Sequence, residues 1–173
     1  MNRLLLFCTF LLVCITTISA QDSLQCNQEY FSDSLLDQLT GPWQASGEVM
    51  GEKVGYAFNV LWVLNHQFLE MNLTDTSAQP AYIAKVMIGY DCDKKQYVVH
   101  WLDNFGGPFS ETLGYGVQKG NAIEMVFNYP EGKLVNTFSY DLGNQQWTSH
   151  AVSLNKQGKW EVFSHIELSR SGQ

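Results

Sequence analysis

The stretch Leu39-Thr-Gly-Pro-Trp43 is the point at which the chain changes its hydrophobic periodicity. Before it, apolar residues follow helical spacing, whereas after it apolar and polar residues alternate as they do in β-strands. Gly41 and Pro42 are residue types that end a helix. The glycine also lets the chain bend inward, so that the indole of Trp43 can plug one end of a barrel. The stretch therefore predicts the start of a β-barrel.

The residues before this stretch predict a short amphipathic helix over 30–39. Its apolar residues recur at helical spacing, and Ser32 or Asp33 is available as the N-cap. These apolar residues are Phe31, Leu35, Leu36 and Leu39.

After Trp43, strand-like segments are joined by short clusters of turn residues, with no helix between them. We expect strands at 43–50, 55–64, 68–75, 81–91, 96–103, 110–119, 122–129, 134–141, 146–155 and 159–169. Closing such an antiparallel meander removes its exposed edges. The sequence thus predicts an all-β fold, an antiparallel up-and-down barrel of about ten strands with a short N-terminal helix. A two-sheet sandwich is the alternative.

The first 20 residues have the pattern of a cleavable signal peptide. Arg3 supplies the positive charge, residues 4–18 are mostly apolar, and Ala20 is the small residue before the expected cleavage site. We therefore expect a signal peptide at 1–20, an N-terminal segment at 21–40 and a barrel at 41–170. The mature protein is then secreted or periplasmic, and no later run of apolar residues is long enough to span a membrane. An uncleaved N-terminal anchor is the alternative.

The charge of the chain argues against two kinds of partner. Cleavage changes the formal net charge from −7 to −8, because Arg3 is the one charged residue of the leader. An acidic surface repels phosphate backbones and anionic lipid head groups. We therefore expect neither nucleic acid nor a membrane surface as the partner.

Two cysteines, Cys26 and Cys92, remain after cleavage. In an exported protein they are candidates for a disulfide, which would join the N-terminal segment to the Asp91-Cys-Asp turn. A bridge closing a loop of this size contributes about 4 kcal/mol in the chain-entropy account. Two unpaired thiols are the alternative.

Alternation places apolar and aromatic side chains on one face of the sheet, which is the interior of a barrel. In the last strand, this reasoning puts Trp160, Val162, Ile166 and Leu168 on that face and Phe163 and His165 on the other. An interior of this kind is either packed solid or holds a ligand. The residues expected to line the interior and bind a ligand are Tyr56, Phe58, Trp62, Glu70, Asp103, Met125, Phe127 and His150.

Carboxylates within or beside the strands leave an enzymatic function open. Asp103 with Glu70 or Glu111 could act as general acid and base if they converged in a pocket; the alternative is that they are solvated outward residues. The chain has no Gly-x-Ser-x-Gly motif, and its glycine-rich stretch at 106–108 joins two strands instead of opening a helix. No catalytic residue is therefore predicted.

None of the four histidines is paired at metal-chelating spacing, so no metal site is predicted. His150 or His165 could offer a single nitrogen to haem iron inside a barrel. The alternative is that each is a hydrogen-bonded residue of the barrel wall. We therefore expect no cofactor, with haem as the alternative.

Several motifs, in their order and spacing, resemble the DUF1579 family, a group of uncharacterised lipocalin-like proteins. They are Gly41-Pro-Trp43, Gly47-Glu48, the stretch 60–70, Ile88-Gly-Tyr-Asp91, Lys95-Gln-Tyr97 and Trp101-Leu-Asp103. The resemblance runs from about Leu39 to Arg170 and implies a lipocalin-like barrel of the calycin type, with no established activity. Such barrels commonly stack a basic side chain of the last strand on the first tryptophan, so the resemblance implies that Arg170 stacks on Trp43.

The chain is also similar, more distantly, to nitrobindin-like barrels, in which ten strands surround haem bound by a histidine near the C-terminus. That similarity implies His165 as the ligand, although its alternation with Glu161 and Glu167 predicts that it faces solvent. We therefore expect an exported protein that binds a small apolar or amphipathic molecule in its barrel. The alternatives are a haem protein with nitric-oxide or peroxynitrite chemistry and a carboxylate-based enzyme.

Overall fold

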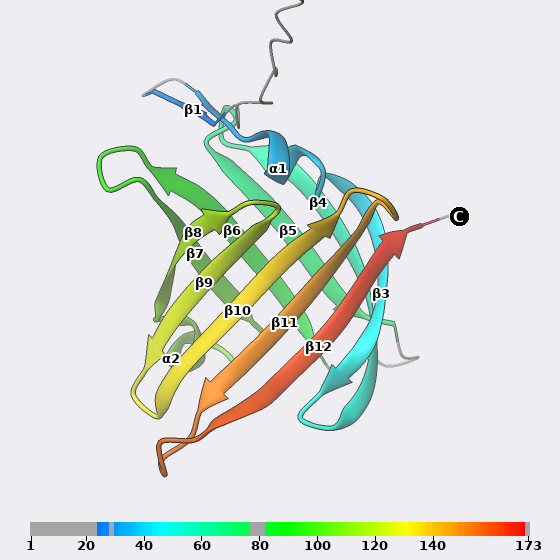
Figure 1. The fold of residues 1–173 in the computed structure, drawn as a ribbon, viewed down its shortest axis with the longest axis vertical. Coiled ribbons are helices and arrows are strands. Elements are labelled where there is room, and N and C mark those ends of the chain that lie inside the picture. The colour runs from blue at the N-terminus through cyan, green and yellow to red at the C-terminus, as the bar shows by residue number, and fades with distance from the viewer. Residues whose placement is uncertain (1–23, 28–29, 77–81, 172–173) are drawn as a thin grey trace, which may run out of the picture.

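The computed structural model describes residues 24–27, 30–76 and 82–171. Ten antiparallel strands form a closed barrel in which each strand pairs with its neighbours in the sequence and the last strand pairs with the first (Figure 1). The strands are β3 (Gly41–Val49), β4 (Glu52–Val63), β5 (Phe68–Asp75), β6 (Ile83–Asp91), β7 (Gln96–Asp103), β8 (Leu113–Lys119), β9 (Ala122–Tyr129), β10 (Gly132–Asp141), β11 (Gln146–Leu154) and β12 (Trp160–Arg170). The predicted all-β barrel is confirmed, and the sandwich alternative is wrong.

The N-terminal segment lies across one end of the barrel, which we call the closed end (Figure 1). It consists of β1 (Gln25–Cys26), β2 (Phe31–Ser32) and the helix α1 (Ser34–Asp37). Asp33 caps this helix, because its carboxylate accepts hydrogen bonds from the backbone N–H groups of Leu35 and Leu36. The helix is shorter than predicted, since Phe31 and Ser32 pair with β1 instead of joining it. The predicted signal peptide, residues 1–20, lies outside the described residues.

Several cross-links hold this segment on the barrel. Cys26 and Cys92 form the predicted disulfide, with their Cα atoms 6.0 Å apart. Asp33, which is buried, also accepts a hydrogen bond from the hydroxyl of Tyr97, an inward residue of β7. The segment is therefore tied to β6, β7 and the turn between them.

Trp43 fills the closed end, as predicted from its position after Gly41. Its side chain is fully buried, and its Nε1–H donates to the backbone oxygen of Leu39 at 2.7 Å. The guanidinium carbon of Arg170 lies 3.9 Å from the centre of the indole, and the same guanidinium donates to the backbone oxygens of Gln38 and Thr40. The predicted pairing of Trp43 with Arg170 is therefore confirmed.

The strand predictions miss two features, both near the opposite end of the barrel. A short helix, α2 (Gly107–Ser110), lies where we predicted a turn, so β8 begins at Leu113. The pairing of β11 with β12 is irregular between Ala151 and Val152, and this bulge reverses the alternation at the start of β12. Trp160 and Val162 therefore point outward and are 51% and 64% exposed, so their predicted placement on the inward face is wrong.

No helix in the described part of the chain is long and apolar enough to cross a membrane.

Candidate binding site at the open end of the barrel

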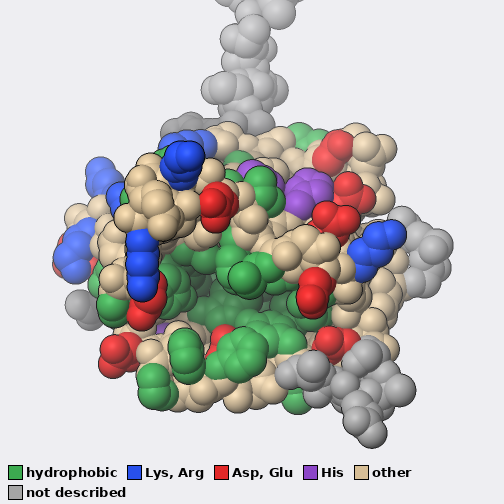
Figure 2. Space-filling view, turned by 90° about the horizontal axis from the view of Figure 1, so that it is seen from below, with side chains coloured by type: hydrophobic (Ala, Val, Ile, Leu, Met, Phe, Trp, Pro, Cys, Tyr) green, Lys and Arg blue, Asp and Glu red, His purple; other side chains and the backbone are tan. Residues whose placement is uncertain are grey.

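The end of the barrel opposite α1 is hollowed, and hydrophobic side chains cover most of the surface of this hollow (Figure 2). We call it the open end. Inward residues of the closed half, such as Trp43, Leu69 and Trp147, are completely buried. Nearer the open end, several inward side chains are only partly buried, among them Val54, Trp101 and Tyr129. Solvent therefore reaches the inward face of the barrel at this end.

One wall of the open half is built from small side chains. Ala45 on β3, Ala151 on β11 and Ser164 on β12 all lie on the inward face and are buried. Deeper in the barrel, the hydroxyl of Ser149 donates to the side-chain oxygen of Asn136 at 2.9 Å, and both residues are buried. Small residues on adjacent strands leave the space that larger side chains would fill, which accounts for the hollow.

The rest of the wall of the open half carries aromatic side chains, beginning with Tyr56 on β4, which pairs with Ala45. The rings of Tyr56 and Tyr82 are 6.0 Å apart in an edge-to-face arrangement, and Phe105 lies 5.7 Å from Tyr82. The indole Nε1–H of Trp101 donates to the hydroxyl oxygen of Tyr82 at 2.8 Å. Tyr129, at the end of β9, stacks on Phe127 at 6.0 Å. These rings offer a large apolar contact surface with a few polar atoms at its edge.

Asp103 is the last residue of β7, and it joins this wall through its carboxylate. One carboxylate oxygen accepts from the Tyr82 hydroxyl at 3.4 Å, and the other accepts from the backbone N–H of Phe105 at 3.0 Å. The backbone N–H of Asp103 donates to the hydroxyl of Ser110 in α2. The short helix therefore fixes the position of Asp103 at the rim of the hollow.

The tyrosines of this wall stay protonated well above neutral pH. Burial is the main cause of the raised pKa of Tyr129, and the nearby Asp103 carboxylate raises it further. The pKa of Tyr56 is raised by burial and by the charge of Asp75. Burial also raises the pKa of Tyr82. Each ring is thus a neutral phenol with its apolar face available for contact.

The structure places half of the predicted ligand-binding residues well inside the barrel. Tyr56, Phe58, Met125 and Phe127 are buried inward residues, and Tyr56 and Phe127 contact the aromatic wall. Trp62, in contrast, belongs to the closed end. Its Nε1–H donates to the carboxylate of Asp37 at 2.8 Å, and its ring stacks on His66 at 4.1 Å.

Two of the predicted residues lie on the outer surface, so their placement in the interior is wrong. Glu70 alternates with the buried Leu69 and Met71, and it pairs with Lys85 at 2.8 Å on the outer face. His150 lies between the buried Ser149 and Ala151 and is exposed. Its ring packs 5.8 Å from that of His165, which is exposed as its alternation with the glutamates predicted.

Neither of the two predicted chemical sites is assembled by the fold. His150 and His165, the two candidates for binding haem, both lie outside the barrel. The carboxylates Asp103 and Glu70 are on opposite faces of the wall, and Glu111 is an exposed residue at the end of α2. Among the described residues, no group of three or more histidine, cysteine or acidic side chains is placed to hold a metal ion.

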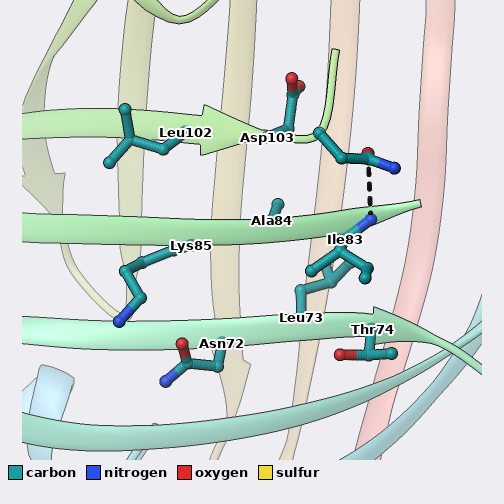
Figure 3. Close-up of a pocket in the computed structure, with 9 residues that line it drawn as sticks. Asn72, Leu73, Thr74, Ile83, Ala84, Lys85, Leu102 and Asp103 are labelled. Atoms are coloured by element: carbon teal, nitrogen blue, oxygen red, sulfur yellow. Dashed lines mark hydrogen bonds between the residues drawn. The ribbon is translucent and has the colours of Figure 1, made fainter. Parts of the chain in front are cut away.

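A shallow depression of about 350 Å³ lies over the lower ends of β5, β6 and β7 (Figure 3). The side-chain oxygen of Asn104 accepts from the backbone N–H of Ile83 at its edge. The outward residues that line it include Asn72 and Lys85, which are both engaged with Glu70. The depression is shallow and wide open to solvent, so we regard the hollow, and not the depression, as the candidate site.

Sequence reasoning did not select Tyr82, Trp101, Tyr129, Asn136 or Ser149 as members of the site. Trp101 has the same alternation as Asp103, and Tyr129 the same as Phe127, so both signals were present in the sequence. Tyr82 precedes its strand, so alternation does not place it. Asn136 lies two residues before Phe138, and Ser149 two residues after Trp147, so alternation points both inward, but polar side chains are not expected in an apolar interior.

Comparison with known proteins supports the fold. A crystal structure of Rv2717c from M. tuberculosis is similar to this barrel, with a TM-score of 0.52 and 14% sequence identity, and the match covers 79% of this chain and 94% of that one. At this identity the likeness shows a common fold alone. No match is found among curated proteins. The family model described as "Protein of unknown function (DUF1579)" matches residues 32–170, which is most of the sequence, and the chain therefore belongs to the DUF1579 family.

Proposed function

We propose that this protein binds a small apolar or amphipathic molecule in the hollow at the open end of its barrel. The observation that carries the proposal is the difference between the two ends. Trp43 and α1 fill one end, whereas the other is open, and hydrophobic side chains line its hollow (Figure 2). A concave, largely apolar surface with a few polar groups is the usual form of a small-molecule site.

The two walls give different contributions to such binding. Contact with the rings of Tyr56, Tyr82 and Trp101 removes apolar ligand surface from water, at about 25 cal/mol for each Å² buried. The small wall leaves space for the body of the ligand, and the Tyr82 hydroxyl and Asp103 carboxylate at the edge of the aromatic wall can orient one polar group of it. A ligand with an apolar body and a polar group fits both walls.

The proposed site of action is outside the cytosol. The disulfide between Cys26 and Cys92 is a bond that persists in oxidising compartments. Together with the signal-peptide pattern at 1–20, it supports a secreted or periplasmic protein. Secretion of the full-length chain with loss of residues 1–20, read by N-terminal sequencing of the exported product, is the expected result.

Binding can be tested with N-phenyl-1-naphthylamine, an apolar dye whose fluorescence rises when it leaves water. We expect saturable enhancement with the wild-type protein and at least about a tenfold weaker affinity for Ala45→Phe, because the larger ring occupies the hollow. The matched control is Gln44→Phe, which places the same ring at an exposed position of the same strand. Thermal unfolding of both variants checks that they are folded.

Absence of saturable dye binding by the wild type would contradict the proposal. Equal binding by folded Ala45→Phe and Gln44→Phe would place the dye elsewhere on the protein. A haem or carboxylate-enzyme function is not proposed, since no described contact brings the residues predicted for either function together in the interior.

A further inference from the structure

The charges at the open half of the barrel have one sign. The described inward positions there carry acidic residues, among them Asp75 and Asp103, and no lysine or arginine. Arg170, the one basic residue that reaches into the barrel among those described, is held at the closed end by Trp43 and two backbone oxygens. The field inside the hollow is therefore negative.

Among the described residues, Asp103 has neutral hydrogen-bond donors around it but forms no ion pair with a cation. In the described part of the chain, ion pairs with lysine are formed by Glu70, Asp91 and Glu124, and none by Asp103. Its two described side-chain partners are the Tyr82 hydroxyl and the Phe105 backbone N–H. A half-buried carboxylate at the rim of an apolar hollow is stabilised further when a positive charge lies beside it.

The aromatic rings beside Asp103 favour the same kind of charge. Tyr82 is within hydrogen-bond distance of the carboxylate, and Trp101 donates to the hydroxyl of Tyr82. Tyr56 lies against Tyr82, and Tyr129 is close enough for the charge of Asp103 to raise its pKa. The faces of such rings attract cations, and several rings around one carboxylate form the arrangement that recognises ammonium groups.

Resting on the proposed function, we propose that the ligand is a cationic amphiphile, with an ammonium head group held by Asp103, Tyr82 and the neighbouring rings. Its apolar chain then extends into the hollow toward the small wall of Ala45, Ala151 and Ser164. An anionic head group would meet the carboxylate of Asp103 at the same place, which disfavours it.

Three amphiphiles with the same twelve-carbon chain test this assignment: dodecyltrimethylammonium, dodecyl maltoside and dodecyl sulfate. Each is used below its critical micelle concentration, and its affinity is measured by displacement of N-phenyl-1-naphthylamine. We expect the ammonium compound to bind at least about tenfold more tightly than the neutral maltoside, with the sulfate weakest. Equal affinities, or tighter binding of the sulfate, would overturn the head-group assignment.

Asp103→Asn is the decisive variant, because the amide oxygen can still accept from the Phe105 N–H and keep the local fold. It should bind the ammonium compound about tenfold more weakly and the maltoside as the wild type does. Glu167→Gln is the control, since it removes one carboxylate from the exposed outer face of β12. If both variants weaken ammonium binding equally, the preference comes from net charge and the proposed site is wrong.

The role of the rings is tested separately at Tyr129. Tyr129→Phe keeps the ring and should retain the preference for the ammonium compound, whereas Tyr129→Leu should reduce it. If Tyr129→Leu leaves the ratio of ammonium to maltoside affinity unchanged, this ring is not part of the site. Failure of the wild type to bind the dye at all would instead contradict the proposed function, so the two failures are distinguishable.

Discussion

Trp43 holds the closed end together through a hydrogen bond at the edge of its ring and a cation on its face. Its Nε1–H satisfies the backbone oxygen of Leu39, and the guanidinium of Arg170 covers its face. Arg170 also donates to the backbone oxygens of Gln38 and Thr40. One side chain of β12 thus satisfies two backbone acceptors just before β3. The role of this tryptophan is therefore structural.

Replacing Trp43 with alanine should lower the free energy of unfolding by about 3 kcal/mol or more, because a fully buried indole leaves a large cavity. Urea unfolding followed by circular dichroism measures this change. Trp160→Ala is the control, since this indole is 51% exposed and its loss should cost less than about 1 kcal/mol. A Trp43→Ala protein of normal stability that no longer binds the dye would show that the residue serves the ligand instead.

Single residues also show where the sequence was sufficient and where it was not. Glu70, which we predicted to line the interior, stands between the apolar Leu69 and Met71, so alternation alone would have placed it on the outer face, where it lies. His150 stands between Ser149 and Ala151, whose small side chains carry almost no hydrophobic signal although both face inward. The sequence is least informative at such a wall, and this is the wall that leaves room for a ligand.

At the scale of elements, the strands followed from alternation and turn residues. The bounds of β5, β7 and β9 agree with the prediction, because clear turn clusters flank each of them. The bulge between β11 and β12 could not be predicted, since it depends on how two strands pair and not on either sequence alone. Helix α2 is a single turn, too short to show helical periodicity.

The N-terminal segment is a separate element that the disulfide and several side-chain hydrogen bonds hold on the barrel. Its own β1–β2 pairing joins only two residues on each side, so cross-links to the barrel must hold it. Besides the disulfide, the buried Asp33 links α1 to Tyr97. These contacts lie at the end of the barrel that is remote from the proposed ligand.

Changing both Cys26 and Cys92 to serine should lower the free energy of unfolding by up to about 4 kcal/mol, because the closed loop no longer restricts the unfolded chain. Dye binding at the open end should remain, since neither cysteine lines the hollow. Urea unfolding and dye titration of the same preparation measure both effects. Wild-type protein treated with reductant should show the same loss of stability and the same dye binding as the double variant. Loss of dye binding in a folded double variant would contradict the separation of the two ends.

For the whole molecule, the barrel divides into a filled half and a hollow half. The large buried side chains Trp43, Trp147 and Tyr97 gather near α1, where each removes a large apolar surface from water. The open half has small residues beside aromatic ones, and this arrangement leaves space that larger side chains would fill. Stability and proposed binding are thus assigned to opposite ends of one sheet.

The arrangement of the chain ends has a practical consequence. The segment before β3 and the end of β12 both lie at the closed end (Figure 1). A bulky fusion partner joined before residue 24 or after residue 171 should therefore leave the association rate of the dye unchanged. The same bulk conjugated to a cysteine introduced at Gly107, in α2 beside the hollow, should slow association, as stopped-flow fluorescence would show. A protein attached to a surface or to another domain through either end presents its opening outward, away from the attachment.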